Sequence, residues 1–284
     1  MKNRPTLVDY HIHTEYSFDY NCYASPGRVF DMCEAALRNG LSQIALTDHY
    51  DINTSEAGIQ MGLDFEQRRA DIMRAKKAYE GHLEVLHGVE LGQPHQVPIK
   101  AAHIIDEYKF DFVIGSYHNN IDVPDFSLLD YENTDRELLV KYYRDYLNET
   151  IDHVKWGIGR ISTLGHIGYP LRYLVINGLG DILDPYSDEY LSVTKEIFSL
   201  LIKNDIALEV NTSGWRQGVN DSLPFGGMVQ YYLDMGGKLI TVGSDCHNSY
   251  MIGSGIEKEY GILKRMGVNE IVTFKNGNMG FIEL

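Results

Sequence analysis

Two histidines, His11 and His13, are the first residues along the chain whose spacing suits metal binding. They end an apolar stretch that starts at Leu7. On a β-strand, side chains two residues apart project to the same face. We therefore expect the two imidazoles to point the same way, close enough to hold one metal ion. A His-x-His pair also occurs by chance on solvent-exposed strands, so the rest of the chain has to decide.

The same pattern recurs along the chain. Several apolar segments of strand length end in His, Asp or Glu. Neutral imidazoles and carboxylates together suit zinc, iron or manganese. One ion takes about four to six ligands, so the full set predicts two or three divalent ions. The candidate metal ligands are His11, His13, Asp19, His49, Glu90, His118, His166, Asp245 and His247.

These ligands divide into three hypothetical groups around Glu90, which we expect to bridge two ions. A carboxylate that follows an apolar strand is costly to bury unless it is paired. The first ion takes His11, His13, Glu90 and Asp245, the second takes Glu90, His118 and His166, and the third takes Asp19, His49 and His247. Structural or surface roles are expected for His82, His87, His95, His103 and His153.

The elements that must position these residues alternate between strand-like and helix-like segments. The expected strands are residues 6–10, 43–47, 83–89, 111–115, 161–164, 206–210 and 238–242, with a last one at 270–274. The expected helices are 64–80, 99–107, 134–156, 188–203, 224–235 and 250–266, and a first helix that begins at Ser25-Pro26 and runs to Asn39. Long loops are expected over 119–133 and around 169–172.

Such alternation predicts parallel strands with helical crossovers. Seven or eight units in 284 residues favour an α/β class barrel of the distorted (β/α)7 type, with residues 1–284 forming a single domain. A doubly wound sheet is the alternative, but no Gly-rich dinucleotide loop follows the first strand. Barrel enzymes carry their chemistry at the C-terminal ends of the strands, which is where the candidate ligands stand.

Composition narrows the possible partners. A net charge of −15 without a basic stripe argues against nucleic acid, and no apolar run approaches the length of a membrane span. Cys22, Cys33 and Cys246 are an odd number without CxxC spacing, which predicts a reducing cytoplasm. The first residues lead straight into a half-polar strand, so we expect no signal peptide. The oligomeric state is not indicated.

At this point the ordered motifs resemble those of the polymerase-and-histidinol-phosphatase (PHP) family over nearly the whole chain. The resemblance implies a distorted (β/α)7 barrel with a trinuclear metal centre. Two segments, Gly165 to Arg172 and Glu209 to Arg216, are similar to the monofunctional histidinol-phosphatase branch. Tyr50 departs from relatives that have a carboxylate or Asn at that position, and Asp19 stands where several relatives have histidine. The motifs are His11-x-His13, Thr47-Asp48-His49, Gly88-Val89-Glu90, Gly115-Ser116-x-His118, Gly165-His166 and Gly243-Ser244-Asp245-x-His247.

The resemblance implies metal-dependent hydrolysis of a small phosphate monoester, L-histidinol phosphate, to L-histidinol and phosphate in histidine biosynthesis. Arg172 and Arg216 are then expected to bind phosphate oxygens in a fork, and Asp245 or a metal-held water is the candidate acid. The expected pocket lining for the ammonium and imidazole groups is Asp48, Glu209 and Asn211.

Other functions stay open at this stage. The chain could be another PHP-family phosphoesterase, such as an exonuclease or a protein-tyrosine phosphatase, or a non-catalytic metal-binding module. A metal-dependent amidohydrolase is disfavoured, because no lysine stands at a strand exit to bridge metals.

Overall fold

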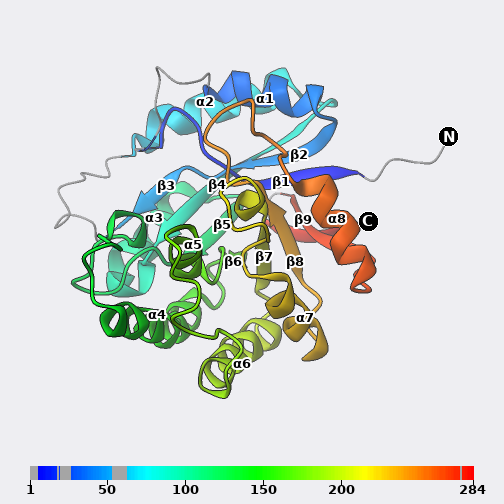
Figure 1. Ribbon diagram of the computed structural model, residues 1–284. Coiled ribbons are helices and arrows are strands. Elements are labelled where there is room, and N and C mark those ends of the chain that lie inside the picture. Colours follow the sequence, from blue (N-terminus) through cyan, green and yellow to red (C-terminus); the bar gives the residue numbers. More distant parts are fainter. Residues whose placement is uncertain (1–5, 18, 20–26, 53–62, 276) are drawn as a thin grey trace.

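Seven parallel strands form a nearly closed barrel, hydrogen-bonded in the order β1-β2-β4-β5-β6-β7-β8 (Figure 1). The computed structural model describes residues 6–17, 19, 27–52, 63–275 and 277–284. The distorted (β/α)7 barrel expected from the sequence is confirmed. The strands are β1 Leu7–Ile12, β2 Leu41–Leu46, β4 Glu84–Gly92, β5 Phe112–Ser116, β6 Thr163–Leu164, β7 Ala207–Asn211 and β8 Ile240–Gly243.

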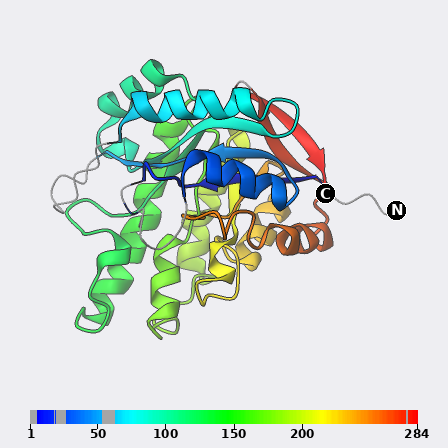
Figure 2. The same ribbon diagram turned by 90° about the horizontal axis from the view of Figure 1, so that it is seen from above.

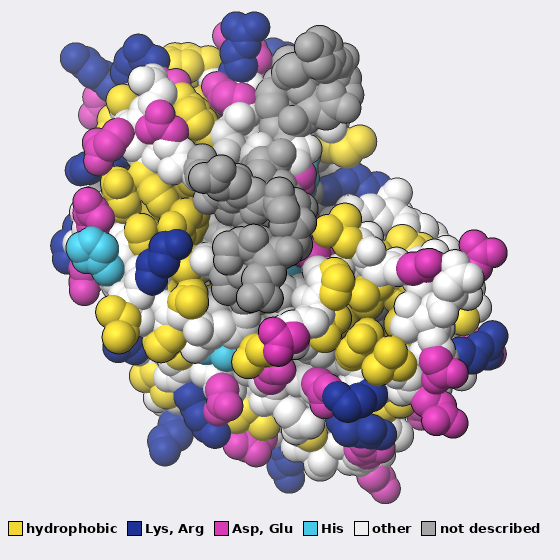
Figure 3. Space-filling model, turned by 90° about the vertical axis from the view of Figure 1, so that its left-hand side faces the viewer, with side chains coloured by type: hydrophobic (Ala, Val, Ile, Leu, Met, Phe, Trp, Pro, Cys, Tyr) yellow, Lys and Arg dark blue, Asp and Glu magenta, His cyan; other side chains and the backbone are white. Residues whose placement is uncertain are grey.

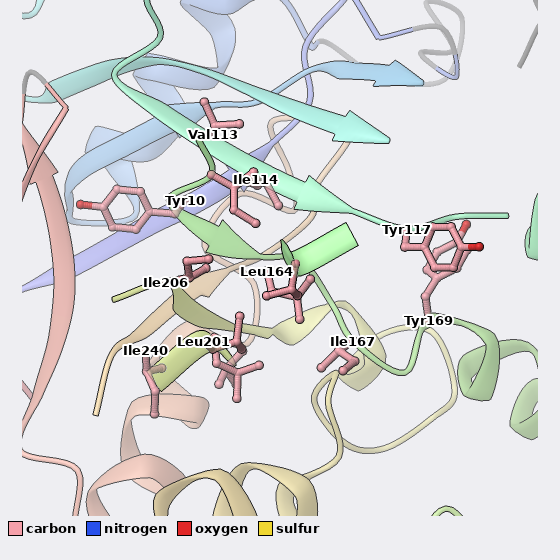
Figure 4. Close-up of a cluster of buried hydrophobic side chains, with 14 of the residues drawn as sticks. Tyr10, Val113, Ile114, Tyr117, Leu164, Ile167, Tyr169, Leu201, Ile206 and Ile240 are labelled. Carbon is pink, nitrogen blue, oxygen red and sulfur yellow. The ribbon is translucent and has the colours of Figure 1, made fainter. Parts of the chain in front are cut away.

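The helices surround the strands (Figures 1 and 2). Figure 4 shows Ile114 and Leu164 packed between the strands, and Leu201 among the buried side chains beside them. None of the described helices is both long and apolar enough to span a membrane. The helices are α1 Val29–Arg38, α2 Phe65–Ala78, α3 Pro98–Tyr108, α4 Arg136–Gly157, α5 Tyr169–Ile176, α6 Asp188–Lys203, α7 Gly226–Asp234 and α8 Ile256–Arg265.

The barrel closes between its first and last strands at the C-terminal end. The Asp245 N–H donates to the His11 carbonyl at 2.7 Å, and the His13 N–H donates to the Cys246 carbonyl at 2.9 Å. The buried Asp9 carboxylate reinforces this seam by accepting from the N–H of Ser244 at 2.8 Å. Backbone bonds therefore fix three predicted ligands, His11, His13 and Asp245, relative to one another.

The strand around Glu90 differs from the prediction. A short extra strand, β3 (His49–Asp51), pairs with the end of β4 and places His49 opposite Glu90. Because of this pairing β4 continues to Gly92, so Glu90 lies inside the strand and not after it. The sequence did not indicate β3, since its three residues are too few for a periodic pattern.

The predicted loop around residues 169–172 was wrong, because these residues open α5. Gly168 precedes the helix in the left-handed region, with φ of +94°, and Pro170 occupies its first turn, where a missing N–H costs nothing. Arg172 is therefore held on a helix. The expected start at Ser25-Pro26 lies outside the described residues.

The chain ends in an antiparallel hairpin, β9 (Glu270–Lys275) and β10 (Asn278–Glu283), which forms a separate sheet. Only the first of these two strands was predicted. On the face shown in Figure 3, the Lys and Arg side chains of the described residues are dispersed among Asp and Glu, without forming a continuous stripe.

Candidate metal centre

The ends of the strands bring five imidazoles around the carboxylate of Glu90, which is fully buried. Its Oε2 lies 3.2 Å from Nε2 of His11, 3.5 Å from Nε2 of His13 and 2.7 Å from Nδ1 of His49. Its Oε1 lies 2.9 Å from Nε2 of His166 and 3.2 Å from Nε2 of His118. The two oxygens thus face two different sets of histidines, which is the arrangement that a bridging carboxylate needs.

The first predicted ligand group has the spacing of a tetrahedral metal site. His11 Nε2 lies 3.2 Å from Glu90 Oε2 and 3.8 Å from Asp245 Oδ1, and His13 Nε2 lies 3.5 Å and 3.3 Å from the same two oxygens. Bonds of about 2.0–2.2 Å to one tetrahedral ion separate neighbouring ligand atoms by about 3.3–3.6 Å. The four atoms can therefore share a single ion.

The second and third predicted groups also come together. The Nε2 atoms of His118 and His166 lie 3.4 Å apart, beside Glu90 Oε1. Asp19 Oδ2 lies 2.7 Å from His247 Nε2 and 3.7 Å from His49 Nε2. The third group adjoins the first, because the His247 ring stacks on His13 with centroids 4.1 Å apart.

Several of these buried atoms form no hydrogen bond of good geometry: Nε2 of His11, Nε2 of His13 and Oε2 of Glu90. A buried polar atom without a partner is costly, and here the atoms face one another. Divalent cations would satisfy them, so the donor set fits the metals that the sequence predicted.

The other ring nitrogen of three ligands meets an oxygen. Glu209 Oε1 lies 2.6 Å from His11 Nδ1, Asp51 Oδ1 lies 3.0 Å from His118 Nδ1, and Ser17 Oγ lies 3.0 Å from His13 Nδ1. Such partners fix the ring orientation and leave Nε2 for a metal. Sequence reasoning missed Asp51 and Ser17 in this role and considered Glu209 only as pocket lining. One signal was present, because Glu209 is a carboxylate in an apolar strand.

Gly243 makes room for the Glu209 contact. A Cβ atom at Gly243 would lie 2.4 Å from His11 Cβ and 2.7 Å from Glu209 Oε1. Any larger residue would push the carboxylate away from the imidazole. The glycine of the Gly-Ser-Asp motif therefore has a packing reason.

Electrostatic coupling in the cluster is strong. Burial lowers the pKa of His11, but Glu209, Glu90 and Asp245 outweigh it and raise that pKa well above its usual range. Burial raises the pKa of Asp245, but His11, His13 and Arg172 hold it well below its usual range. Bound cations would stabilise this ionised form further. Asp245 is thus better suited to hold an ion than to supply a proton, contrary to its expected role as an acid.

Arg172 lies beside the cluster, and its Nε is available to donate a hydrogen bond. Its side chain is buried, its Nη2 donates to Ser213 Oγ at 2.8 Å, and it reaches Asp245 Oδ2 at 3.4 Å. Its Nε has no partner. The Tyr169 ring lies 5.1 Å from the guanidinium carbon and limits its movement. This geometry suits an arginine that donates to a phosphate oxygen.

The other expected substrate contacts have different surroundings. Arg216 donates to the carbonyls of Ser244 and Asp245, so it holds the loop after β8 and is not free to form a fork on phosphate. Asn211 is buried and its Oδ1 accepts from the N–H of Ser213, which caps a short 3₁₀ helix.

Asp48 also differs from the expectation. It is fully buried, its Oδ2 accepts from Arg68 and its Oδ1 accepts from the Thr14 hydroxyl at 2.9 Å. Its carboxylate is paired with Arg68 inside the protein, so Asp48 does not line the pocket as expected. Its effect on the metal centre is indirect, because it positions the residues between His13 and Ser17.

Fold and site together define a parallel α/β barrel with clustered histidines and carboxylates, which could hold metal ions, at the C-terminal ends of its strands. The family model described as "PHP domain" matches residues 9–213, so the chain belongs to the PHP domain family.

Relatives match it along nearly their whole length. A histidinol-phosphatase of Lactococcus lactis is 25% identical over 276 residues, which is 94% of each chain. A Clostridium acetobutylicum protein named probable histidinol-phosphatase is 27% identical and covers 87% of this chain and 89% of its own. The crystal structure of the L. lactis histidinol phosphate phosphatase, complexed with zinc, L-histidinol and phosphate, has the same fold. It has a TM-score of 0.74 and 23% identity, and covers 96% of this chain and 98% of its own.

Proposed function

We propose that this chain is a metal-dependent phosphoric monoester hydrolase that converts L-histidinol phosphate to L-histidinol and phosphate in histidine biosynthesis. The observation that carries the proposal is the Glu90 carboxylate, which faces imidazoles on both sides. Beside it, Arg172 contacts the candidate ligand Asp245 and keeps an unpaired Nε. The histidinol-phosphatases that match over nearly the whole chain support the choice of substrate.

Two or three divalent ions would occupy the three ligand groups, with Glu90 between the first two. When bound, zinc, iron or manganese would polarise the phosphoryl group and lower the pKa of water enough to supply a hydroxide nucleophile near neutral pH. Three carboxylates among the ligands, Asp19, Glu90 and Asp245, offset only part of the cations' charge. The remaining positive charge favours a phosphate dianion.

The protein's own side chains then act on the substrate and on the ligands. Arg172 donates from Nε to a non-bridging phosphate oxygen and stabilises the charge that develops as the ester bond breaks. Arg216 holds the loop that carries Asp245. Glu209 and Asp51 keep the imidazoles of His11 and His118 in the tautomer that presents Nε2 to the centre.

The kind of partner follows from the same proposal. We infer a small-molecule substrate and no nucleic-acid partner, in keeping with the net charge of −15. The cytoplasmic location and the single domain over residues 1–284 stay predictions from the sequence.

The test combines elemental analysis with an assay of phosphate release. Purified protein should contain about two or three divalent ions per chain and should hydrolyse L-histidinol phosphate far faster than simple sugar phosphates. Glu90→Gln should lose at least one ion and about 10³-fold in kcat, because a neutral amide cannot bridge two cations. Glu84→Gln is the matched control, since Glu84 lies on the same strand and pairs with Lys275 far from the centre.

Three results would contradict the proposal. Equal rates on all phosphate esters would leave only a generic phosphatase. Faster release from a single-stranded oligonucleotide would favour an exonuclease. Metal binding without any turnover would favour a regulatory module.

A further inference from the structure

The loop between β5 and α4 presents a carboxylate, that of Asp125, beside the metal centre. The N–H of the next residue, Phe126, donates to the carbonyl of the candidate ligand His118 at 3.0 Å. Asp125 also caps the short 3₁₀ helix Phe126–Leu128 by accepting from the N–H of Ser127 at 2.7 Å. The position of this half-exposed carboxylate is therefore tied to that of His118.

The surroundings of Asp125 are aromatic. The Tyr169 hydroxyl donates to its Oδ1 at 3.1 Å, and the Tyr173 hydroxyl donates to that of Tyr169 at 3.0 Å. Burial, the Tyr173 hydroxyl and the Asp125 carboxylate together raise the pKa of Tyr131, which places a third tyrosine in this neighbourhood. Across the described chain, no Lys, Arg or His forms an ion pair with Asp125.

Tyr169, which is labelled among the buried side chains in Figure 4, connects this carboxylate to the reaction centre. Its ring centroid lies 5.0 Å from that of His118 and 5.1 Å from that of His166. The guanidinium of Arg172 lies 5.1 Å from the same ring. The expected phosphate donor and the Asp125 carboxylate thus both contact one tyrosine.

We propose that Asp125, together with the rings of Tyr169 and Tyr173, binds the ammonium group of the substrate and so selects amino-alcohol phosphates. The inference rests on the proposed function. A carboxylate attracts an organic cation through its charge, and neighbouring tyrosine rings add attraction through their quadrupoles. Only two carbons separate the ester oxygen of L-histidinol phosphate from its amine. Since Arg172 and Asp125 both contact Tyr169, a phosphate bound at Arg172 would direct the ammonium towards Asp125.

The experiment compares three phosphate esters with the metal-loaded enzyme and with Asp125→Asn, which can still accept the hydrogen bonds of Ser127 and Tyr169. The esters are L-histidinol phosphate, the same compound without its amino group, and p-nitrophenyl phosphate. Asp125→Asn should lower kcat/KM for L-histidinol phosphate by at least about tenfold, mainly through KM, because an ammonium loses a charge-assisted contact. Its kcat/KM for the other two esters should stay within about twofold of wild type.

The control variant is Asp122→Asn, an exposed carboxylate of the same loop whose φ of +59° suits asparagine. It should behave as wild type on all three esters. A wild-type enzyme without preference for L-histidinol phosphate would overturn the proposed function itself. A wild-type enzyme with that preference, retained by Asp125→Asn, would overturn only the role of Asp125. An equal loss on all three esters would also overturn it, since it would reveal a purely structural residue.

Discussion

Among individual residues, the buried charges of the centre show how much the sequence can predict. Glu90 and Glu209 are carboxylates in apolar strands, and both are buried among imidazoles or backbone N–H groups. Isolated charges at such positions would be too costly to keep, so each marks a site from sequence alone. In contrast, His87 stands on the same strand as Glu90 and has no part in the centre.

His87 provides a prediction at this scale. Strand alternation directs its side chain away from Glu90, against Phe110, with ring centroids 4.8 Å apart. Burial and the nearby Arg68 and Arg69 lower its pKa to about 2, compared with about 6.5 in an unfolded chain. Between these two pH values the unfolded state binds a proton that the folded state does not bind. Stability should therefore fall as pH decreases through this window, by up to about 1.4 kcal/mol per pH unit from this residue.

Urea unfolding of the metal-free protein between pH 6 and pH 4 tests this. His87→Leu should show a shallower loss of stability with acid than wild type. His103→Leu, at an exposed helix position, should keep the wild-type slope. Equal slopes for wild type and His87→Leu would refute the assignment.

The residues that sequence reasoning missed depend on contacts between distant segments. Asp51 meets His118, and Asp125 meets Tyr169, across sequence separations that no local pattern encodes. Asp48 was assigned to the pocket because it precedes His49, yet its partner Arg68 lies on α2 and removes it from the surface. Residue type and position at a strand end therefore predicted which side chains gather at the centre better than they predicted the supporting residues.

Among the elements, α5 determines the geometry of the substrate side. It carries both Tyr169 and Arg172, and its first turn follows directly after the ligand His166. The sequence predicted a loop here because the helix has only eight residues, too few for a clear apolar period. The longer elements, such as α4 and α6, were predicted nearly to their ends.

The left-handed Gly168 before α5 leads to the prediction for this element. Gly168→Ala should cost about 1–2 kcal/mol, because alanine is strained at a φ of +94° although there is space for its Cβ. If the strain shifts α5, the KM for phosphate esters should rise as Arg172 and Tyr169 move. Gly178→Ala is the matched control, since Gly178 is also left-handed but follows the far end of the helix. It should lose similar stability in thermal unfolding and keep the wild-type KM; a raised KM in both variants would contradict the link to α5.

At the scale of the whole molecule, the barrel converts separate short motifs into one centre. Its parallel strands all end at the same mouth, and this is why the order of the motifs predicted both the fold and the gathering of these side chains. Closure between β1 and β8 completes the first ligand group, because His11 and Asp245 come from opposite ends of the chain. Metal binding should therefore stabilise the whole barrel.

Removal of the metals should lower the unfolding temperature, because ions that bind only the folded state contribute to its stability. An ion present at a hundred times its Kd adds about 2.7 kcal/mol, which corresponds to roughly 5–10 °C for a chain of this size.

In the metal-free protein burial lowers the pKa of His118, but Asp51 and Glu90 outweigh burial and raise that pKa to about 10. The stability from this protonated histidine is present below pH 6.5 and is lost as pH rises towards 10, whereas a metal-bound imidazole carries no such proton. The gap in unfolding temperature between loaded and chelated protein should consequently be wider at pH 8.5 than at pH 6.5. Calorimetry with chelator and with restored zinc measures both gaps, and a gap that is absent or narrows with rising pH would contradict a centre built from these histidines.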